Sequence, residues 1–214
     1  MPAVCPVVKT AFISAVSNIL ERSLGTAFFI LPSAAPSIEQ LCITEPKAAS
    51  KLVRNFSLYL RGNFSELDNV KPIRFSQEMN HVKHYTDIEQ VRFPDITIQY
   101  DLRSVEFLLP ALSVQPLVEN AIKHGLMGLE EGGIVTISAY ETDSHYVVEV
   151  TDDGVGFDMN AGYDETKHVG IKNIRGRIEA MCNGTLAIES KIGSGTKATI
   201  KIPKEEAEND SNNS

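Results

Sequence analysis

Four short segments in the second half of this 214-residue sequence carry residues suited to binding a ligand. They are Leu-Val-Glu-Asn-Ala-Ile-Lys-His-Gly at 117–125, Asp-Asp-Gly-Val-Gly at 152–156, Val-Gly-Ile-Lys-Asn at 169–173 and Gly-Ser-Gly-Thr at 193–196. Carboxylate, amide and basic groups can hold cations, bases and phosphates, and glycine lets the backbone approach a ligand. Each segment also has an ordinary structural explanation, respectively an exposed helix face, a turn, a helix start and a hairpin.

The first segment lies in an expected amphipathic helix. Its apolar residues follow the spacing of one buried helix face: Val114, Leu117, Val118, Ala121 and Ile122. Glu119 and Lys123 are four residues apart, and so are Asn120 and His124. This spacing predicts four hydrogen-bonding side chains on the stripe opposite the apolar one.

The glycine-containing segments follow a strand or begin a helix or a strand. Asp152 ends an expected strand, where its carboxylate can accept a hydrogen bond from a ligand. Gly154 and Gly156 follow, and glycine lets the backbone come close to that ligand. Gly170 precedes an expected helix whose free N–H groups offer a site for phosphate. Thr196 begins the last expected strand.

The elements that must position these segments form a mixed α/β region from residue 94. Alternating apolar residues predict a strand at 96–100. Further strands are expected at 134–141, 146–152, 185–190 and 196–202, with a helix at about 171–181. This order describes a mixed sheet with helices on one face. The fold class is therefore expected to be an α+β sandwich rather than a doubly wound fold.

The first ninety residues look entirely helical. Apolar spacing predicts helices at 8–31, 47–61 and 76–93, and two prolines follow the first of them. The apolar stretch 7–20 is too short to span a bilayer and lacks the charge pattern of a signal peptide. We therefore expect a soluble, cytoplasmic chain, or the cytosolic part of a longer one that a missing upstream segment would anchor in a membrane.

Composition excludes several classes of protein. A hydrophobic fraction of 43% and a charged fraction of 22% are ordinary for globular proteins and exclude collagen-like, wholly disordered and disulfide-scaffold chains. With 28 acidic against 20 basic residues the net charge is −8, so no nucleic-acid partner is expected. Residues 204–214 hold four acids and one lysine and are expected to be a disordered tail. The cysteines, Cys5, Cys42 and Cys182, are too widely spaced to suggest a disulfide framework or a zinc site.

Together, and in this order, the four segments resemble the N, G1, G2 and final glycine-threonine boxes of the Bergerat ATP-binding fold. Residues 116–125 and 170–178 resemble, more closely, the LytS-type sensor histidine kinases of bacteria, and 56–61 and 85–93 resemble the helical dimerisation region of that group. The resemblance covers roughly residues 38–203. It implies a helical dimerisation region at 1–93 and an ATP-binding catalytic domain at 94–203.

The resemblance implies roles for the polar helix stripe, with ATP and Mg²⁺ as the bound cofactors. Asn120 matches the family's Mg²⁺-binding asparagine, and Mg²⁺ prefers oxygen ligands shared with phosphates. Glu119 matches the proposed general base of catalysis. Lys123 and His124 lie where the family contacts phosphate or ribose.

The resemblance also implies roles for the other three segments. Asp152 matches the aspartate that accepts the adenine amino group, with Gly154 and Gly156 letting the base and a lid pack. Gly170, together with Ile171 and Asn173 at the start of the next helix, faces the phosphates, and Thr196 lies near adenine. The loop 157–169 would be the nucleotide lid. His168 replaces the first glycine of the G2 box, which we interpret as a subfamily variation.

The histidine that accepts the phosphoryl group in this family has no counterpart. One alignment puts Phe29 at that position, and a gapped one puts Ser33 there. Neither side chain can supply the neutral ring nitrogen that attacks the γ-phosphorus. Of the remaining histidines, His81 and His84 are expected on a solvated helix face and His145 in a hairpin turn.

The leading hypothesis is an ATP-dependent histidine kinase module that has lost its own acceptor, so that self-phosphorylation is doubtful. The alternative is a nucleotide-binding scaffold that pairs with another histidine kinase or a response regulator. A different Bergerat ATPase is disfavoured by the upstream match. We expect a homodimer through the N-terminal helices, and a strong dependence on Mg²⁺ because a net-acidic chain must bind a polyanion.

Overall fold

The computed structural model describes residues 38, 40–67, 71–103, 106–127, 129–158 and 169–204. The expected helix at 8–31, the positions Phe29 and Ser33, most of the lid, His168 and the acidic tail after Lys204 lie outside these ranges. None of the described helices is long and apolar enough to cross a bilayer.

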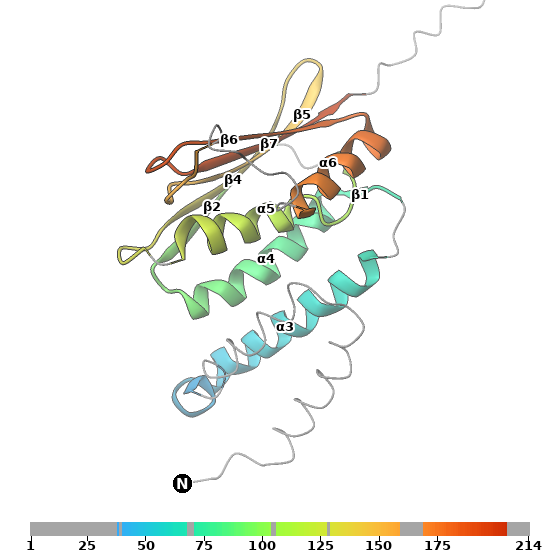
Figure 1. Ribbon diagram of the computed structural model, residues 1–214. Helices are drawn as coiled ribbons and strands as arrows, with labels where there is room; N and C mark the ends of the chain where they lie inside the picture. The colour runs from blue at the N-terminus through green and yellow to red at the C-terminus, as the bar shows by residue number, and fades with distance from the viewer. Residues whose placement is uncertain are drawn as a thin grey trace, which may run out of the picture.

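Two long helices form the N-terminal part of the described chain. Helix α3 covers Pro46–Leu67 and α4 covers Phe75–Arg92, which confirms both expected helices and extends the first toward its C-terminus. They lie side by side (Figure 1) because each presents an apolar stripe to the other. The buried residues of the α3 stripe are Ala49, Leu52, Phe56, Tyr59 and Leu60.

A five-stranded sheet forms the opposite layer, in the order β2-β4-β5-β7-β6. The strands are β2 (Ile96–Leu102), β4 (Gly133–Glu141), β5 (His145–Asp152), β6 (Thr185–Ser190) and β7 (Thr196–Pro203). Strand β2 runs parallel to β4, and the other three pairings are antiparallel. The sheet is therefore mixed, as the sequence predicted.

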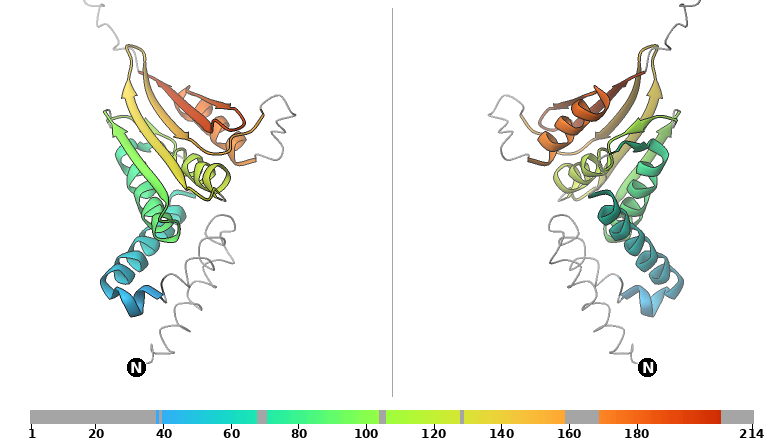
Figure 2. Two further views of the ribbon diagram at one scale, coloured as in Figure 1. Left: turned by 90° about the vertical axis from the view of Figure 1, so that its left-hand side faces the viewer. Right: turned by 90° about the vertical axis from the view of Figure 1, so that its right-hand side faces the viewer.

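One face of this sheet carries the helices. They are α5 (Gln115–Asn120), the π-helical turn η1 (Ala121–Leu126) and α6 (Val169–Cys182), with α4 beside them. Figures 1 and 2 show α5 and α6 on the same side of the sheet, and α3 farther away beyond α4. The core between the layers includes Val118, Ile137, Ile178 and Ile200, all buried. The expected α+β sandwich is confirmed.

A second, two-stranded sheet was not expected. Strand β1 (Ile73–Arg74) pairs antiparallel with β3 (Leu108–Leu109), and two residues are too few to show an alternating pattern. Next to it the rings of Phe75 and Phe107 stack at 4.7 Å, and those of Phe107 and Tyr146 at 4.9 Å. These contacts fix the start of α4 against the sheet.

Candidate functional site

Asp152 ends β5 with a carboxylate that is almost completely buried, since the residue is 4% exposed. Its Oδ1 accepts a hydrogen bond of 3.0 Å from the N–H of Gly154. Burial raises the pKa of the carboxyl group above its ordinary value, and the backbone N–H groups of Gly154 and Thr196 oppose that rise. A carboxylate fixed in this way can accept a hydrogen bond from an amino group of a ligand.

Three glycines from different segments close around Asp152. A Cβ at Gly125 would lie 2.6 Å from Asp152 Oδ1, and a Cβ at Gly154 would lie 2.2 Å from the carbonyl oxygen of Gly125. Gly195 has a φ of +78°, and a Cβ there would lie 1.8 Å from the carbonyl oxygen of Asp152. The N–H of Val155 donates to the Gly125 carbonyl at 3.0 Å. No larger residue fits these three positions without moving Asp152 or its neighbours.

Ser190 joins the loop after β5 to the start of β7. Its hydroxyl accepts a hydrogen bond from the N–H of Phe157 at 2.9 Å and donates one to the carbonyl of Gly195 at 3.0 Å. The hydroxyl oxygens of Ser190 and Thr196 are also 3.0 Å apart. Thr196 itself lies directly opposite Asp152 in the β5–β7 pairing.

Sequence reasoning identified part of this cluster. The structure brings together Asp152, Gly154 and Thr196, and it places Gly156 in the same loop with a φ of +58° that favours glycine. Gly125 and Gly195 stand inside the segments noted above, but no individual role was predicted for them. Ser190 was missed because a serine at the end of a strand carries no local signal.

The helix stripe is arranged differently from the expectation. The regular helix α5 ends at Asn120, and Lys123 and His124 lie in the π-helical turn η1. A π-turn inside a helix is rare and is frequently found at functional sites. Asn120 and Lys123 are partly buried, and His124 is exposed.

Glu119 does not lie on an open stripe opposite the core, and this part of the prediction is wrong. The residue is 6% exposed, since α4 packs against α5 and Tyr59 of α3 reaches its carboxylate. Its Oε1 accepts hydrogen bonds from the hydroxyl of Tyr59 at 3.3 Å and from Nε2 of Gln115 at 3.0 Å, while Lys123 Nζ lies 3.6 Å from Oε2. Glu119 therefore faces the helical region, and no single-helix pattern could have shown that contact.

The third segment opens α6. This helix begins at Val169, so Gly170 and Ile171 lie in its first turn rather than before it, and Asn173 follows on an exposed position. A Cβ at Gly170 would meet no atom within 4 Å. The first turn of a helix carries backbone N–H groups without intrahelical partners, which suits it to an anion.

The described histidines lie away from this cluster, apart from His124. His84 is on α4 and His145 starts β5, where Ser144 Oγ lies 2.7 Å from its Nδ1. His81, also on α4, lies against Gly62 of α3 and is partly buried rather than fully solvated.

Two family descriptions match the chain over the parts just described. Residues 110–206 match "Histidine kinase-, DNA gyrase B-, and HSP90-like ATPase", and residues 35–97 match "Histidine kinase". The chain carries the ATPase domain of LytS-type sensor histidine kinases. The match to the helical region begins at residue 35, after both positions considered for the acceptor histidine.

Bacterial proteins align with most of this chain. Sensor histidine kinase YpdA of Escherichia coli is 35% identical over 74% of this chain and 29% of its own length. An uncharacterised protein of Bacillus subtilis, YwpD, is 30% identical over 72% of this chain and 58% of its own length. The sensor protein LytS of Bacillus subtilis is 26% identical over 80% of this chain and 31% of its own length. The chain thus spans less than two thirds of each of these relatives.

Solved histidine kinases have the same fold. The histidine kinase domain of a blue-light activated kinase from Erythrobacter litoralis superposes with a TM-score of 0.52 at 16% identity, covering 91% of this chain and 93% of that one. Acinetobacter baumannii histidine kinase AdeS gives a TM-score of 0.50 at 16% identity, covering 91% and 95%. At such low identity these likenesses concern the fold alone.

The donor set of the ATPase domain fits a magnesium nucleotide. Asn120 offers an amide oxygen on a partly buried position, and Mg²⁺ accepts such a ligand beside phosphate oxygens and water. Around the buried carboxylate of Asp152, which can accept a hydrogen bond, the neighbouring glycines present only backbone atoms to a ligand. The start of α6 adds backbone N–H groups without intrahelical partners.

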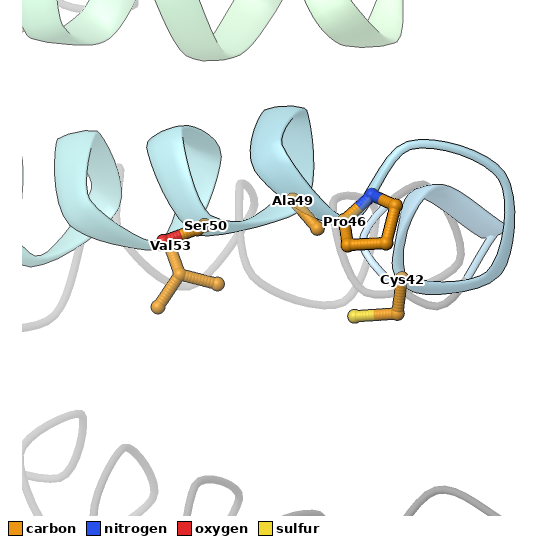
Figure 3. A pocket seen from close by; sticks show the side chains of 5 residues that line it. All are labelled: Cys42, Pro46, Ala49, Ser50 and Val53. Carbon is orange, nitrogen blue, oxygen red and sulfur yellow. The ribbon is translucent and has the colours of Figure 1, made fainter. Parts of the chain in front are cut away.

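A hollow outside this cluster does not suit a phosphate. It has a volume of about 300 Å³ and lies on α3, lined by Cys42, Pro46, Ala49, Ser50 and Val53 (Figure 3). None of these five side chains is charged, so the hollow offers no group to balance a polyanion.

Proposed function

We propose that this chain binds Mg-ATP and transfers its γ-phosphoryl group to a histidine, as the catalytic module of a two-component sensor histidine kinase. The observation that carries the proposal is the buried carboxylate of Asp152, held at the end of β5 by Gly154 and enclosed by glycine backbone. A fixed buried acceptor selects a ligand that brings a donor, because an unpaired polar group there is costly. The amino group of adenine is such a donor.

The nucleotide would lie across three elements. Asp152, Gly154, Gly156 and Thr196 bind the base. Asn120 holds Mg²⁺, which neutralises phosphate charge when bound. Lys123 and His124 contact phosphate or ribose, and Gly170, Ile171 and Asn173 contribute the start of α6 to the phosphates. The partial positive charge of a helix N-terminus supports this last role.

Phosphoryl transfer needs a base for the acceptor. A neutral histidine nitrogen attacks the γ-phosphorus, the bond from that phosphorus to the oxygen of the departing ADP breaks, and the ring loses the proton of its other nitrogen. Glu119 takes this proton in our proposal. Gln115 and Lys123 orient its carboxylate, with Gln115 Nε2 at 3.0 Å from Oε1 and Lys123 Nζ at 3.6 Å from Oε2.

The acceptor would belong to another protein. With Phe29 or Ser33 at the family's acceptor position, this chain supplies no imidazole there. We propose that residues 1–93 form the dimerisation region, in a homodimer or with another histidine kinase, and that 94–203 form the catalytic domain. A response regulator would receive the phosphoryl group downstream.

The missing imidazole also favours a second candidate function, a nucleotide-binding scaffold without transfer. The two candidates share Mg-ATP binding and differ only in chemistry. Incubation with γ-labelled ATP separates them. The kinase proposal expects no acid-labile label on this chain alone and acid-labile label on a partner histidine kinase that cannot bind ATP itself. Binding without any label on a partner would support the scaffold.

Calorimetric titration with Mg-ATP tests the shared step. The wild-type chain should bind at or below millimolar nucleotide. Asp152→Asn, which replaces an acceptor oxygen by a donor, and Asn120→Ala, which removes the amide oxygen, should each bind at least about tenfold more weakly. Asp153→Asn is the matched control, because Asp153 is exposed and its Oδ1 accepts from the N–H of Ile134 at 2.7 Å. A wild-type chain that does not bind millimolar Mg-ATP would overturn the proposal.

Light scattering tests the dimer. We expect a homodimer through the N-terminal helices at tens of micromolar protein, because the exposed Ile43 and the uncharged hollow at Cys42, Ala49 and Val53 leave apolar surface open beside α3. A monomer at that concentration would contradict it.

A further inference from the structure

The helix that carries Asn120 has no local cap at its N-terminus. Val114, the residue before α5, has helical backbone angles and makes no side-chain capping bond. The hydroxyl of Ser113, one residue earlier, makes its hydrogen bond within the preceding turn, where it donates to the carbonyl of Pro110 at 2.6 Å. The first N–H groups of a helix have no intrahelical partners, so another group must bind them.

That group is the carboxylate of Glu78, which comes from the first turn of α4. Its Oε2 accepts a hydrogen bond from the N–H of Leu112 at 2.8 Å, and its Oε1 accepts from Val114 at 2.9 Å and Gln115 at 3.2 Å. Leu112 has a φ of +54°, in the left-handed region. The turn that leads into α5 is thus wrapped around a side chain from another helix.

Glu78 is completely buried, at 0% exposure, although it carries a carboxyl group. Burial raises its pKa, while the N–H groups at the start of α5 oppose that rise. A buried carboxyl group is expensive, and a local Ser or Asp cap would satisfy the first N–H groups of the helix at lower cost. The costly arrangement ties α5 to α4 specifically.

The same turn is also held by α6. Arg177 of α6 donates a hydrogen bond through Nη2 to the carbonyl of Ala111, and its charge interacts favourably with Glu78. Residues 111–115 therefore lie between Glu78 and Arg177. The first turn of α6, with Gly170, is two turns upstream of Arg177, and Asn120 is five residues after Gln115. Both helices of the candidate phosphate site meet at this turn.

We propose that Glu78 is a positioning residue for the nucleotide site, which couples the placement of α4 to Mg-ATP affinity through the start of α5. The proposal rests on the Mg-ATP binding proposed above. Figure 1 shows α4 between α3 and α5, so a shift of the helical pair reaches Asn120 through the Glu78 contact. Because coupling between two positions is reciprocal, bound Mg-ATP in turn tightens that contact.

Glu78→Gln and Glu78→Ala test this proposal in the full chain. Glutamine keeps one oxygen for Val114 and Gln115 but presents its amide N–H to the N–H of Leu112, so it loses part of the cap, whereas alanine loses all of it. We expect the affinity for Mg-ATP to fall about tenfold in Glu78→Ala and by a smaller factor in Glu78→Gln. Should the alanine variant fail to fold, the glutamine variant carries the test.

Thr86→Val is the control for a general loss of α4 stability. Thr86 is also buried on α4, and its Oγ1 lies 2.7 Å from the hydroxyl of Tyr100 on β2, away from α5. This variant should lose stability and keep the wild-type Kd for Mg-ATP. A Glu78→Gln chain that folds and binds Mg-ATP within twofold of wild type would overturn the proposal, as would an equal loss of affinity in Thr86→Val.

Hydrogen exchange supplies a readout that a purely structural cap would not move. Saturating Mg-ATP should slow exchange of the Leu112, Val114 and Gln115 amides several-fold in the wild type and should not do so in Glu78→Gln. Unchanged exchange in the nucleotide-bound wild type would contradict the coupling. If the wild type does not bind Mg-ATP at all, it is the proposed function that fails, so the two failures are distinct.

Discussion

The hydroxyl of Tyr59 on α3 donates a hydrogen bond of 3.3 Å to Oε1 of Glu119 on α5. Sixty residues separate the two in sequence, and both are buried. The residue proposed as the catalytic base is therefore held by the helical region as well as by its own helix.

Removing that hydroxyl should destabilise the fold. Tyr59→Phe keeps the ring contact with Tyr85 at 5.8 Å but removes a donor to a buried carboxylate. We expect the free energy of unfolding to fall by about 1–2 kcal/mol, measured by urea denaturation. Tyr140→Phe is the matched control, since Tyr140 donates to Glu149 at 3.2 Å at the sheet surface, and it should change stability by less than about 0.5 kcal/mol.

The neighbouring Tyr85 should respond in the opposite direction. Its hydroxyl is buried and has no hydrogen-bond partner within the described part of the chain. Tyr85→Phe removes an unsatisfied polar group and keeps the ring, so the free energy of unfolding should rise by about 1 kcal/mol. A loss of stability in urea denaturation would show that the hydroxyl has a partner after all.

Gly125→Ala should impair nucleotide binding. The new methyl group would lie 2.6 Å from Asp152 Oδ1, so the carboxylate must move from its position. We expect Mg-ATP affinity to fall by at least about tenfold in calorimetric titration, the cost of one lost hydrogen bond to a charged group. Gly176→Ala in α6 meets nothing within 4 Å and should instead raise the free energy of unfolding by about 0.5–1 kcal/mol, with binding unchanged.

Ser190→Ala should loosen the loop that follows Asp152. The change leaves the N–H of Phe157 and the carbonyl of Gly195 without their shared partner. The free energy of unfolding should fall by about 1–2 kcal/mol in urea denaturation, because backbone groups lose hydrogen bonds. Ser57→Ala, which removes an exposed bond to the carbonyl of Val53, should stay within about 0.5 kcal/mol of wild type.

His84 should make stability fall in mild acid. Burial lowers the pKa of its imidazole and His81 adds to this, with Asp87 opposing, so the folded state favours the neutral ring. A depressed pKa means that the unfolded chain takes up the proton first, so this contribution is complete above about pH 6.5 and is lost as pH falls below it. By urea denaturation, the free energy of unfolding should differ less between about pH 7.5 and about pH 5.5 in His84→Gln than in the wild type. An equal pH dependence of stability in His84→Gln and the wild type would contradict this prediction.

Much of the fold could be predicted from local pattern. The change from helical to strand period near residue 94, the five longer strands and the helices α4 and α6 follow from the spacing of apolar residues, which acts over a few positions. The pair β1–β3 and the π-turn η1 could not be predicted in this way. Two-residue strands are too short to show a period, and no particular residue type marks a π-turn. The segments around Asp152 could also be recognised in the sequence, because tight turns need glycine and glycine stands out by its type alone.

By itself, the sequence determined which chemical groups the protein has, in which order, and on which kind of element each lies. Asp152 at a strand end and Asn120 on a helix follow from residue type and period alone. Only the tertiary structure decided what those groups contact. It placed Tyr59 over Glu119, the carboxylate of Glu78 at the start of α5, and Gly125 and Gly195 against Asp152. The reason is that local periodicity reports which side of an element is apolar, whereas contacts across 30 to 60 residues depend on how the packed elements meet.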